Sequence, residues 1–564
     1  MKLQSIHWIK GTLLIFIAVV VICIVILAGV PPVSRDALIH HLAIPKLYLQ
    51  HGGIYEIPYA KWSYYPMNLD LLYLIPLYFG NDIIPKYIHF AFALLTALII
   101  FRYLKTRLNV IYALLGVVVF LSLPIIVKLS ITAYVDLGLI FFSFAALFYF
   151  LKWVNHEYKL KFLLISAFWC GLGLGTKYNG LIVLFLLTLF TIFIYSKNSA
   201  VTDKKQAKAI GFGTVFMLVA IIVFSPWGIR NYVWTKNPIY PLYNSWFKSE
   251  NAEALRINTG DASNGAKEEF DSVVGKDNRS WGHFAIRKIV FKEKWWEIAL
   301  IPIRIFFQGE DDNPKYFDGK LNPLLFFLPI IAFFYIKRDS SKLKTEKRIL
   351  FTFSILYILY AFFQVDMRIR YIGPVIPVLV ILSMLGLHDL TNIVQKHFAP
   401  NSKMILLAAV NMAVLSFFCL NIFYLFQQYR IVDPLSFIKG RIGRDVYIER
   451  YRPEYAAIQF ANKHLPENAK ILGIFLGNRG YYCDRAIIFD FGLFKNSVQQ
   501  AVSPEDLTTI LKRSGFTHLL VRFDLFNQWA ESQFNAREKV IIQGFFNNQA
   551  NRLFSKAGHG LFVL

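Results

Sequence analysis

Long apolar runs separated by short polar segments dominate the sequence from residue 10 to residue 427. The first run extends from Gly11 to Val30 without a charge, which is the length an α-helix needs to cross a bilayer. It is too long for the hydrophobic region of a signal peptide, so we predict a retained transmembrane helix. Run length places spans at residues 10–30, 83–101, 110–127, 134–151, 162–176, 179–195, 209–227, 323–336, 349–363, 371–388 and 404–427. The pattern predicts a polytopic α-helical membrane protein with about 11 transmembrane helices.

The basic residues lie mostly in the short loops between these runs. The largest clusters are at residues 102–107, 152–161, 197–208, 337–348 and 396–403. With the N-terminus in the cytoplasm, all of these clusters face the cytoplasm, as the positive-inside rule requires. The formal net charge of +24 therefore indicates membrane orientation and contact with membrane lipids, and no nucleic acid partner. We predict a multi-pass protein of the cytoplasmic (inner) membrane.

One apolar stretch, LDLLYLIPLYFG at residues 69–80, does not fit a crossing. It has about a dozen residues with Pro76 inside, and a crossing here would turn every later basic loop outward. We predict that it lies in the outer membrane interface, within an external juxtamembrane segment of residues 31–82. Because each span moves the chain to the other side of the membrane, the loop 228–322 is also predicted to lie outside. Both segments belong to a transmembrane domain of residues 1–429.

The residues after the last span have a different pattern. Residues 430–564 lack spanning runs and alternate helix-like segments such as EYAAIQFANKHL with strand-like segments such as AKILGIFL. This pattern predicts a C-terminal soluble α/β domain, periplasmic or extracellular, with no motif that identifies a catalytic group. Composition agrees with the membrane assignment, since 56% hydrophobic residues and a mean hydropathy of +0.46 exceed what a water-soluble fold can bury. The four cysteines offer neither a disulfide framework nor a CxxC metal site.

Two acidic residues lie where predicted spans meet the outer surface. Asp36 follows the first span in PPVSRDALIHHLAIPK, and Asp136 ends the turn SITAYVD at the start of a later span. Each could simply cap a helix. A carboxylate facing outward can also deprotonate an acceptor hydroxyl or hold a divalent metal. In an α-helical ALIHHLAIPKLYL, Asp36 and His40 share a face because they are four residues apart, whereas His41 points elsewhere and is assigned no role.

Cations and aromatic side chains lie on the same predicted side. Lys177 lies in GLGLGTKYNG between two apolar runs, and Arg368 and Arg370 precede a span in VDMRIRYIGPVIP. Snorkelling or lipid anchoring explains any single one of these cations better than function does. Together with the aromatic WSYY at residues 62–65, however, they suit a substrate with a lipid phosphate and a polar head.

The order of these motifs resembles that of the membrane-embedded glycosyltransferases of the C-type fold. The nearest likeness is to the bacterial relatives of protein O-mannosyltransferases (glycosyltransferase family 39) and to the lipid A aminoarabinose transferases. It covers nearly all of residues 8–390 and rests on SRDALIHHLAIPKLYLQHGG, YPMNLDLLYLIPLYFG, ITAYVDLGLIFF, GLGLGTKYNG, PWGIRNYVWTKNPIYP and RIRYIGPVIP. The resemblance implies transfer of a sugar, hexose or pentose, from a polyprenyl-phosphate donor to a protein, lipid or glycan acceptor at the outer membrane face, usually with inversion.

The resemblance also implies roles for particular residues. Asp36 matches the catalytic carboxylate and Asp136 the second acidic motif. The positions near the donor phosphate, with neighbouring candidates for substrate binding, are Lys177, Arg368, Arg370, Tyr371, Arg35, His40 and Tyr65. Many relatives have Asp-Glu where this chain has Arg35-Asp36, so no cofactor is certain and a divalent metal is a possibility only. Tyr65 stands before Pro66 where the aminoarabinose transferases have a lysine, which leaves donor and acceptor open.

We hypothesise that Asp36 is the general base on the acceptor hydroxyl, while Lys177, Arg368 or Arg370 stabilises the leaving phosphate. A transporter or flippase of lipid-linked sugars is the main alternative. Its charges would lie near mid-membrane in two related halves, whereas these charges collect at one surface without a convincing repeat. An O-antigen polymerase or ligase would lack the early Asp motif. In a structural subunit, loss of both carboxylates would change assembly alone.

Overall fold

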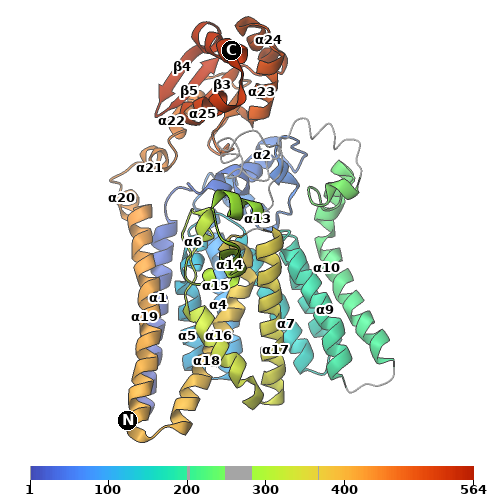
Figure 1. Cartoon of the computed structure of the whole chain (residues 1–564), viewed down its shortest axis with the longest axis vertical. Coiled ribbons are helices and arrows are strands. Elements are labelled where there is room, and N and C mark those ends of the chain that lie inside the picture. Colours follow the sequence, from blue (N-terminus) through green and yellow to red (C-terminus); the bar gives the residue numbers. More distant parts are fainter. Residues whose placement is uncertain (1, 200–203, 248–282, 366) are drawn as a thin grey trace.

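The computed structural model describes residues 2–199, 204–247, 283–365 and 367–564. A bundle of long helices takes up most of the chain, and a small α/β domain built from the C-terminal residues stands at one end of it (Figure 1). The end of the bundle beside this domain is named the upper end below. The N-terminus lies at the opposite, lower end (Figure 1).

Each predicted span corresponds to a helix or, in one case, to a bent pair of helices. The bundle consists of α1 (Lys2–Ala28), α4 (Ile84–Arg107), α5 (Val110–Ser122), α6 (Pro124–Ser130), α7 (Asp136–Asn155), α8 (Leu160–Leu174), α9 (Gly180–Asn198), α10 (Lys205–Thr235), α16 (Leu324–Tyr335), α17 (Ser341–Tyr360), α18 (Ile376–His397) and α19 (Pro400–Val432). Within the described residues, seven helices are long and apolar enough to cross a membrane, or eight if α5 and α6, bent by 63°, count as one span. The predicted number of about 11 is not confirmed, because α8 and α16, for example, have only 15 and 12 residues.

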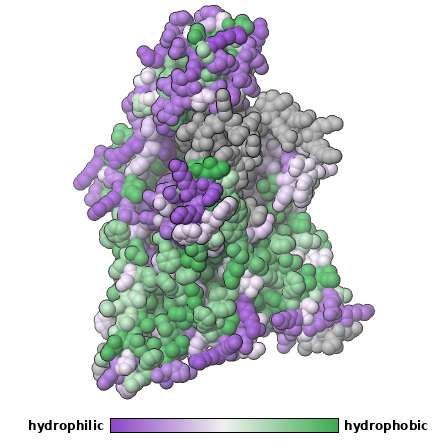
Figure 2. Space-filling view, in the orientation of Figure 1, coloured by the Kyte–Doolittle hydropathy of each residue, from purple (hydrophilic) through white to green (hydrophobic). Residues whose placement is uncertain are grey.

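The bundle has an apolar outer surface and a dense centre. Figure 2 shows apolar residues as a belt on the visible face, between the polar C-terminal domain above and a polar lower edge. The spanning window of α18 is 89% buried and that of α7 is 78% buried, against 22% for α1 and 6% for α19. The chain is therefore a multi-pass membrane protein in which α7 and α18 form the core, and α1 and α19 lie at the periphery.

The residues between α1 and α4 fold over the upper end of the bundle. They form η1 (Ala37–His41), α2 (Ala43–His51), η2 (Lys61–Tyr64) and α3 (Asn68–Tyr78). α3 corresponds to the stretch predicted to lie in the interface, and its 11 residues are too few to cross a bilayer. It packs closely on α7 because Gly138 has no side chain: a Cβ atom there would lie 2.6 Å from Leu69.

Short helices supply the remaining connections. Those between α10 and α16 are η3 (Asn244–Trp246), α13 (His283–Ala285), η5 (Ile286–Val290), α14 (Trp295–Ala299), α15 (Ile301–Arg304) and η6 (Pro314–Tyr316). Those beside α17 and α18 are η7 (Ile336–Arg338), η8 (Ala361–Val365) and η9 (Ile369–Val375). η9 leads directly into α18, so it brings residues 369–375 to the top of the most buried helix.

The C-terminal residues form a sheet with helices on both faces. Its strands are β1 (Lys470–Ile474), β2 (Ala486–Phe489), β3 (His518–Arg522), β4 (Asn551–Lys556) and β5 (His559–Val563), in the order β2-β1-β3-β5-β4. β1 is parallel to β2 and β3, whereas β5 is antiparallel to β3 and β4. The helices are α20 (Pro434–Ile438), α21 (Arg444–Tyr451), α22 (Tyr455–His464), α23 (Phe491–Gln500), α24 (Pro504–Arg513), α25 (Phe523–Gln533), α26 (Ala536–Gly544) and η10 (Phe545–Gln549). Leu472 packs into one apolar core and Ile471 into the other, so β1 is buried on both faces.

The C-terminal domain contacts the segment that carries η1 and α2. The Tyr481 backbone N–H donates to the carbonyl of Leu38 in η1 at 3.1 Å. Lys46 of α2 donates to the carbonyls of Tyr481 and Cys483 at 2.8 and 3.0 Å, and to the Asp484 carboxylate at 2.8 Å. The Tyr481 ring shares an apolar cluster with Leu38. The domain therefore rests directly on η1.

Candidate active site

Asp36 lies at the start of η1 and pairs with Arg370 of η9. Arg370 Nη1 donates to Asp36 Oδ2 at 2.6 Å, which joins two segments 334 residues apart. Capping, one sequence-based alternative for Asp36, is wrong, because its side chain makes no capping hydrogen bond to η1. Burial raises the pKa of this carboxyl group, but Arg370 and the nearby imidazoles outweigh burial and hold the pKa below its ordinary value. Asp36 is therefore an anion near neutral pH.

Asp136 is the first residue of α7 and pairs with Lys177 from the turn between α8 and α9. Lys177 Nζ donates to Asp136 Oδ1 at 2.7 Å, and Asp136 is only 1% exposed. The turn is held by Asn68, whose backbone N–H donates to the Gly175 carbonyl at 2.9 Å and whose side-chain oxygen accepts from Trp227 at 2.7 Å. A second cation–carboxylate pair thus stands at the upper end of the bundle.

A third polar pair joins His41 of η1 to Asp70 of α3. Their closest atoms, Nδ1 and Oδ1, lie 2.7 Å apart, and both side chains are buried. η1 is a single π-helical turn, in which the Leu42 N–H donates to the Ala37 carbonyl at 2.9 Å. Burial raises the pKa of Asp70 to about 7 and lowers that of His41 to about 3. Burial therefore favours the neutral form of both side chains.

Aromatic rings line the space around these pairs. Lys177 Nζ lies 4.8 Å from the ring centroid of Tyr371, and the Arg370 guanidinium lies 5.4 Å from the same centroid. The Tyr65 ring is 4.9 Å from that of Trp62, which stacks on His40 at 4.9 Å. These contacts place His40, Tyr65 and Tyr371 around the pairs.

Several buried polar atoms near the pairs have no hydrogen-bond partner. They are His40 Nδ1, Asp136 Oδ2, Arg230 Nη1 and Arg370 Nε. Arg230 belongs to this neighbourhood because its other terminal nitrogen donates to the Tyr65 carbonyl at 3.1 Å. A buried polar group without a partner is costly, and in a native protein it calls for an explanation such as a ligand. Donors outnumber acceptors among these atoms, so a ligand that satisfied them would be rich in acceptor oxygens.

Two sequence-based candidates lie at the margin of this arrangement. Arg368 Nη1 is 3.9 Å from Asp318, which also pairs with Lys128 at 3.1 Å. Arg35 is half-buried next to Asp36 in the chain. The structure therefore brings Asp36, Asp136, Lys177 and Arg370 together.

The residues at this site do not offer a ready metal-binding set. No group of three or more His, Cys, Asp or Glu side chains that could hold a metal ion occurs among the described residues. Asp36 and Asp136, the carboxylates that the sequence suggests for a divalent metal, each pair with a cationic side chain instead.

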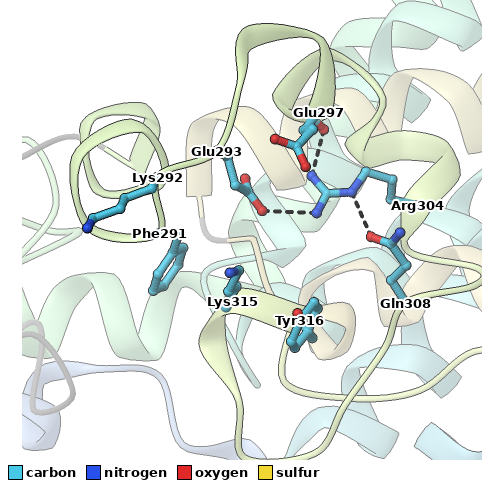
Figure 3. Close-up of a pocket in the computed structure, with 8 residues that line it drawn as sticks. All are labelled: Phe291, Lys292, Glu293, Glu297, Arg304, Gln308, Lys315 and Tyr316. Atoms are coloured by element: carbon cyan, nitrogen blue, oxygen red, sulfur yellow. Dashed lines mark hydrogen bonds and ion pairs between the residues drawn. The ribbon is translucent and has the colours of Figure 1, made fainter.

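A polar pocket of about 190 Å³ lies elsewhere, among α14, α15 and η6 (Figure 3). Arg304 dominates it and donates to Glu293, to the carbonyl of Glu297 and to Gln308 at 2.7–2.9 Å (Figure 3). These groups satisfy one another, in contrast to the unpartnered atoms around Arg370. The pocket is therefore a weaker candidate for chemistry than the site at η1.

Comparisons with known proteins bear on the fold of the chain. Residues 72–229, which include Asp136 and Lys177, match the family model of dolichyl-phosphate-mannose-protein mannosyltransferase. The apo structure of ArnT from Cupriavidus metallidurans superposes with a TM-score of 0.58 at 13% identity, covering 98% of this chain and 98% of that one. The Archaeoglobus fulgidus oligosaccharyltransferase tethered with an acceptor peptide gives 0.55 at 12% identity, covering 92% and 70%. This chain has the C-type glycosyltransferase fold.

The C-type fold confirms the architecture that the motif order implies. The ArnT structure with undecaprenyl phosphate also superposes, with a TM-score of 0.54 at 13% identity and coverage of 98% of each chain. No curated protein sequence matches the chain. The chain shares its fold with ArnT, and residues 72–229 match the family model of the protein mannosyltransferases.

Sequence reasoning missed three residues of this site. His41 was assigned no role, Asp70 was one acid in an apolar stretch, and Arg230 was not singled out. His41 and Asp70 could have been suspected from their rarity, since an ionisable residue inside an apolar helix such as α3 is a functional candidate by default. Arg230 in PWGIRNYVW gives no comparable signal, because an Arg near a helix end is common in membrane proteins.

Proposed function

We propose that this protein transfers a sugar, hexose or pentose, from a polyprenyl-phosphate donor to a protein, lipid or glycan acceptor at the outer face of the cytoplasmic membrane. The observation that carries the proposal is the pair of carboxylate–cation contacts, Asp36–Arg370 and Asp136–Lys177, at one end of an apolar bundle. A lipid-linked sugar phosphate needs an apolar path for its tail, cations for its phosphate and a carboxylate for its sugar or acceptor. The cations and the carboxylates lie together at the upper end of the apolar bundle.

The donor phosphate is assigned to Arg370 and Lys177. Arg370 keeps its buried Nε without a partner, so the guanidinium still has a donor to offer a phosphate oxygen. Lys177 and Arg370 both lie over the Tyr371 ring, which holds the two cations on one side of the site. Two proteins of the same fold were solved with a lipid phosphate, which supports a donor of this class: ArnT bound to undecaprenyl phosphate, and an archaeal oligosaccharyltransferase in complex with an inhibitory peptide and a dolichol-phosphate.

The reaction proposed is a displacement at the anomeric carbon of the sugar. An acceptor oxygen forms a bond to that carbon while the bond from carbon to the phosphate oxygen breaks, and the electron pair leaves with the phosphate. Arg370 and Lys177 stabilise the charge that grows on the phosphate as it leaves. A carboxylate beside the sugar stabilises the positive charge that develops on the ring, and the sequence singles out Asp36 as the base for the acceptor proton.

The test is sugar transfer by the purified protein in lipid, with a panel of radiolabelled polyprenyl-phosphate sugars. The wild type should consume at least one donor, and Asp36→Asn should lower turnover by about 10²- to 10⁴-fold, which is the usual contribution of one acid or base. Asp136→Asn should weaken donor use, because it releases Lys177 from its partner. Asp524→Asn, which changes a half-exposed carboxylate of the C-terminal domain, is the matched control.

Two outcomes would contradict the proposal. A folded wild-type protein that consumes no donor in a broad panel would favour a transporter or flippase, and a vesicle assay of lipid-linked sugar movement would then follow. Full activity in both the Asp36→Asn and Asp136→Asn variants would remove these carboxylates from the mechanism. The orientation in the membrane is tested separately by labelling single cysteines introduced at either end of the bundle.

A further inference from the structure

A groove lies between α16 and α18 at the lower end of the bundle, away from the candidate active site. Its volume is about 550 Å³, within the range of about 300–1,000 Å³ that is usual for ligand pockets. Figure 1 shows the two helices side by side in the lower half of the bundle. The groove is lined by the last turns of both helices and by η7, which continues α16.

Close packing higher in the bundle defines where the groove begins. α17 returns the chain between α16 and α18, so these two helices run in the same direction. They touch where Gly386 of α18 faces Leu328 of α16, because a Cβ atom on Gly386 would collide with the Leu328 carbonyl. Every residue that lines the groove comes three or more positions after one of these two residues in the chain. The groove therefore lies directly below the contact.

Both helices present the same pattern of side chains to the groove. α16 with η7 contributes Ile331, Phe334 and Arg338, and α18 contributes Leu390, Ile393 and His397. Each series has the spacing i, i+3 and i+7, which is typical of one helix face. In each series the two apolar residues come first and the basic residue comes last, at the lower end. The groove therefore has apolar walls and a basic mouth.

A buried lysine fixes the two walls relative to each other. Lys347 of α17 is fully buried, and its Nζ lies 2.8 Å from Asp339 Oδ2 and 2.7 Å from Asp389 Oδ2. Asp339 follows Arg338 in the chain, and Asp389 precedes Leu390. The two carboxylates next to the groove in the chain therefore bind Lys347, and no carboxylate of the described residues lines the groove.

The basic side chains at the mouth have donors to offer. The Arg338 guanidinium lies 5.2 Å from the ring centroid of Tyr335, and neither Arg338 nor His397 makes a hydrogen bond or ion pair to a described residue. Both are exposed. Basic side chains near a helix C-terminus are common, because they offset the helix dipole. Here they also stand at the end of an apolar groove, and the fork of an arginine matches a phosphate.

We propose that this groove binds one anionic phospholipid from the leaflet at the lower end of the bundle. An acyl chain lies between α16 and α18, and the phosphate lies at Arg338 and His397. The seven positions from Ile331 to Arg338 correspond to about 10 Å of helix, which fits within half of a hydrocarbon layer of about 30 Å. An anionic headgroup is favoured over a zwitterionic one, because a choline group would meet like charge at the mouth. This inference is independent of the proposed function.

Native mass spectrometry of the full chain in detergent tests the site. The probes are dioleoyl phosphatidylglycerol and dioleoyl phosphatidylcholine, which share their acyl chains and differ in charge, each titrated onto delipidated protein. The variants are Arg338→Gln, which removes the charge, and Ile393→Trp, which fills the groove and keeps every charge. Lys342→Gln, which changes an exposed lysine in the first turn of α17, is the matched control.

We expect the wild type to bind the first phosphatidylglycerol about tenfold more tightly than phosphatidylcholine, which is the effect of one charge-assisted contact at a partly exposed site. Arg338→Gln should remove most of this preference, Ile393→Trp should weaken the first lipid of both kinds, and Lys342→Gln should behave as the wild type. Because Arg338 is exposed, its variant tests the site even where the bulkier tryptophan disturbs packing.

Three outcomes would overturn the inference. Equal affinity of the wild type for both probes would exclude an anionic site. A loss of preference in Lys342→Gln as large as that in Arg338→Gln would show attraction to the basic surface in general. A folded Ile393→Trp protein that keeps the first lipid with wild-type affinity would place that lipid outside the groove.

Discussion

Replacing Lys46 by methionine should loosen the C-terminal domain from the catalytic segment. The Lys46 ammonium makes three hydrogen bonds to the domain, to two backbone carbonyls and one carboxylate, at 2.8–3.0 Å. Its side chain is 22% exposed, so water competes only partly for these contacts. Methionine keeps most of the apolar stem and removes the charge. The perturbation therefore acts on the contact between domain and bundle and leaves both cores unchanged.

The magnitude follows from these contacts. A hydrogen bond to a charged group contributes about 1.5–3 kcal/mol when it is well protected, and the Asp484 carboxylate, 55% exposed, adds little of its own. Loss of the two carbonyl contacts, with partial replacement by water, should cost docking about 2–3 kcal/mol. That cost corresponds to a roughly 30- to 150-fold fall in the ratio of docked to undocked domain.

Hydrogen exchange of the Tyr481 amide measures this ratio directly, because that N–H donates to the Leu38 carbonyl of η1 only when the domain is docked. We expect faster exchange of peptides that contain Tyr481 and a parallel fall in donor turnover. Lys556→Met, which removes an exposed ion pair with Glu449, is the matched control. Unchanged exchange at Tyr481 in the Lys46→Met protein would refute the view that Lys46 holds the domain in place.

Three further outcomes are expected. Gly175→Ala should lower the melting temperature by the equivalent of about 1–3 kcal/mol, because a Cβ atom there collides with the amide of Asn68, which hydrogen bonds hold in place. Glu346→Gln should cost about 3–5 kcal/mol in unfolding assays, since the fully buried carboxylate pairs with Arg107. His41→Gln leaves a buried acid whose pKa is raised from 3.8 to about 7, so it binds more protons folded than unfolded, and its melting temperature should fall from pH 4 to pH 7. The wild type should change less over that range, because the pKa of His41, lowered from 6.5 to about 3, has the opposite effect.

Controls for these three variants come from the same chain. Gly53→Ala adds a Cβ atom where nothing lies within 4 Å, and Glu531→Gln changes a carboxylate that is 76% exposed. His51→Gln removes an exposed imidazole and should leave the pH dependence of the melting temperature as in the wild type. A Gly53→Ala protein as unstable as Gly175→Ala would contradict the packing argument. A Glu346→Gln protein as stable as Glu531→Gln would contradict the argument from buried charge.

The sequence predicted the architecture well because bilayer physics acts on long segments. Apolar runs became helices, and the argument from basic loops correctly kept α3 out of the spans, since its 11 residues cannot cross. EYAAIQFANKHL and AKILGIFL became α22 and β1. The number of spans was harder to predict. Apolar runs also form helices such as α16, whose 12 residues are shorter than a helix that crosses a bilayer.

The site was harder to predict because tertiary contacts decide it. The α-helical repeat placed Asp36 and His40 on one face and left His41 without a role, whereas in the structure His41 pairs with Asp70 of α3. The pairing of Asp36 with Arg370, 334 residues later, is a tertiary contact that no local pattern contains. The candidates Asp136, Lys177 and Tyr371 did meet in the structure, because their segments all end at the upper surface of the bundle.

The exposed helix α19 links this chemistry to the thickness of the membrane. Its 33 residues span about 50 Å, longer than a hydrocarbon layer of about 30 Å, and only 6% of its apolar window is covered by protein. Such a helix adapts to a thinner bilayer by tilting. Because α19 leads into the C-terminal domain that rests on η1, a change in tilt displaces the support of Asp36 and His41. Lipids of different acyl length should therefore tune the rate of this protein with no change in substrate or sequence.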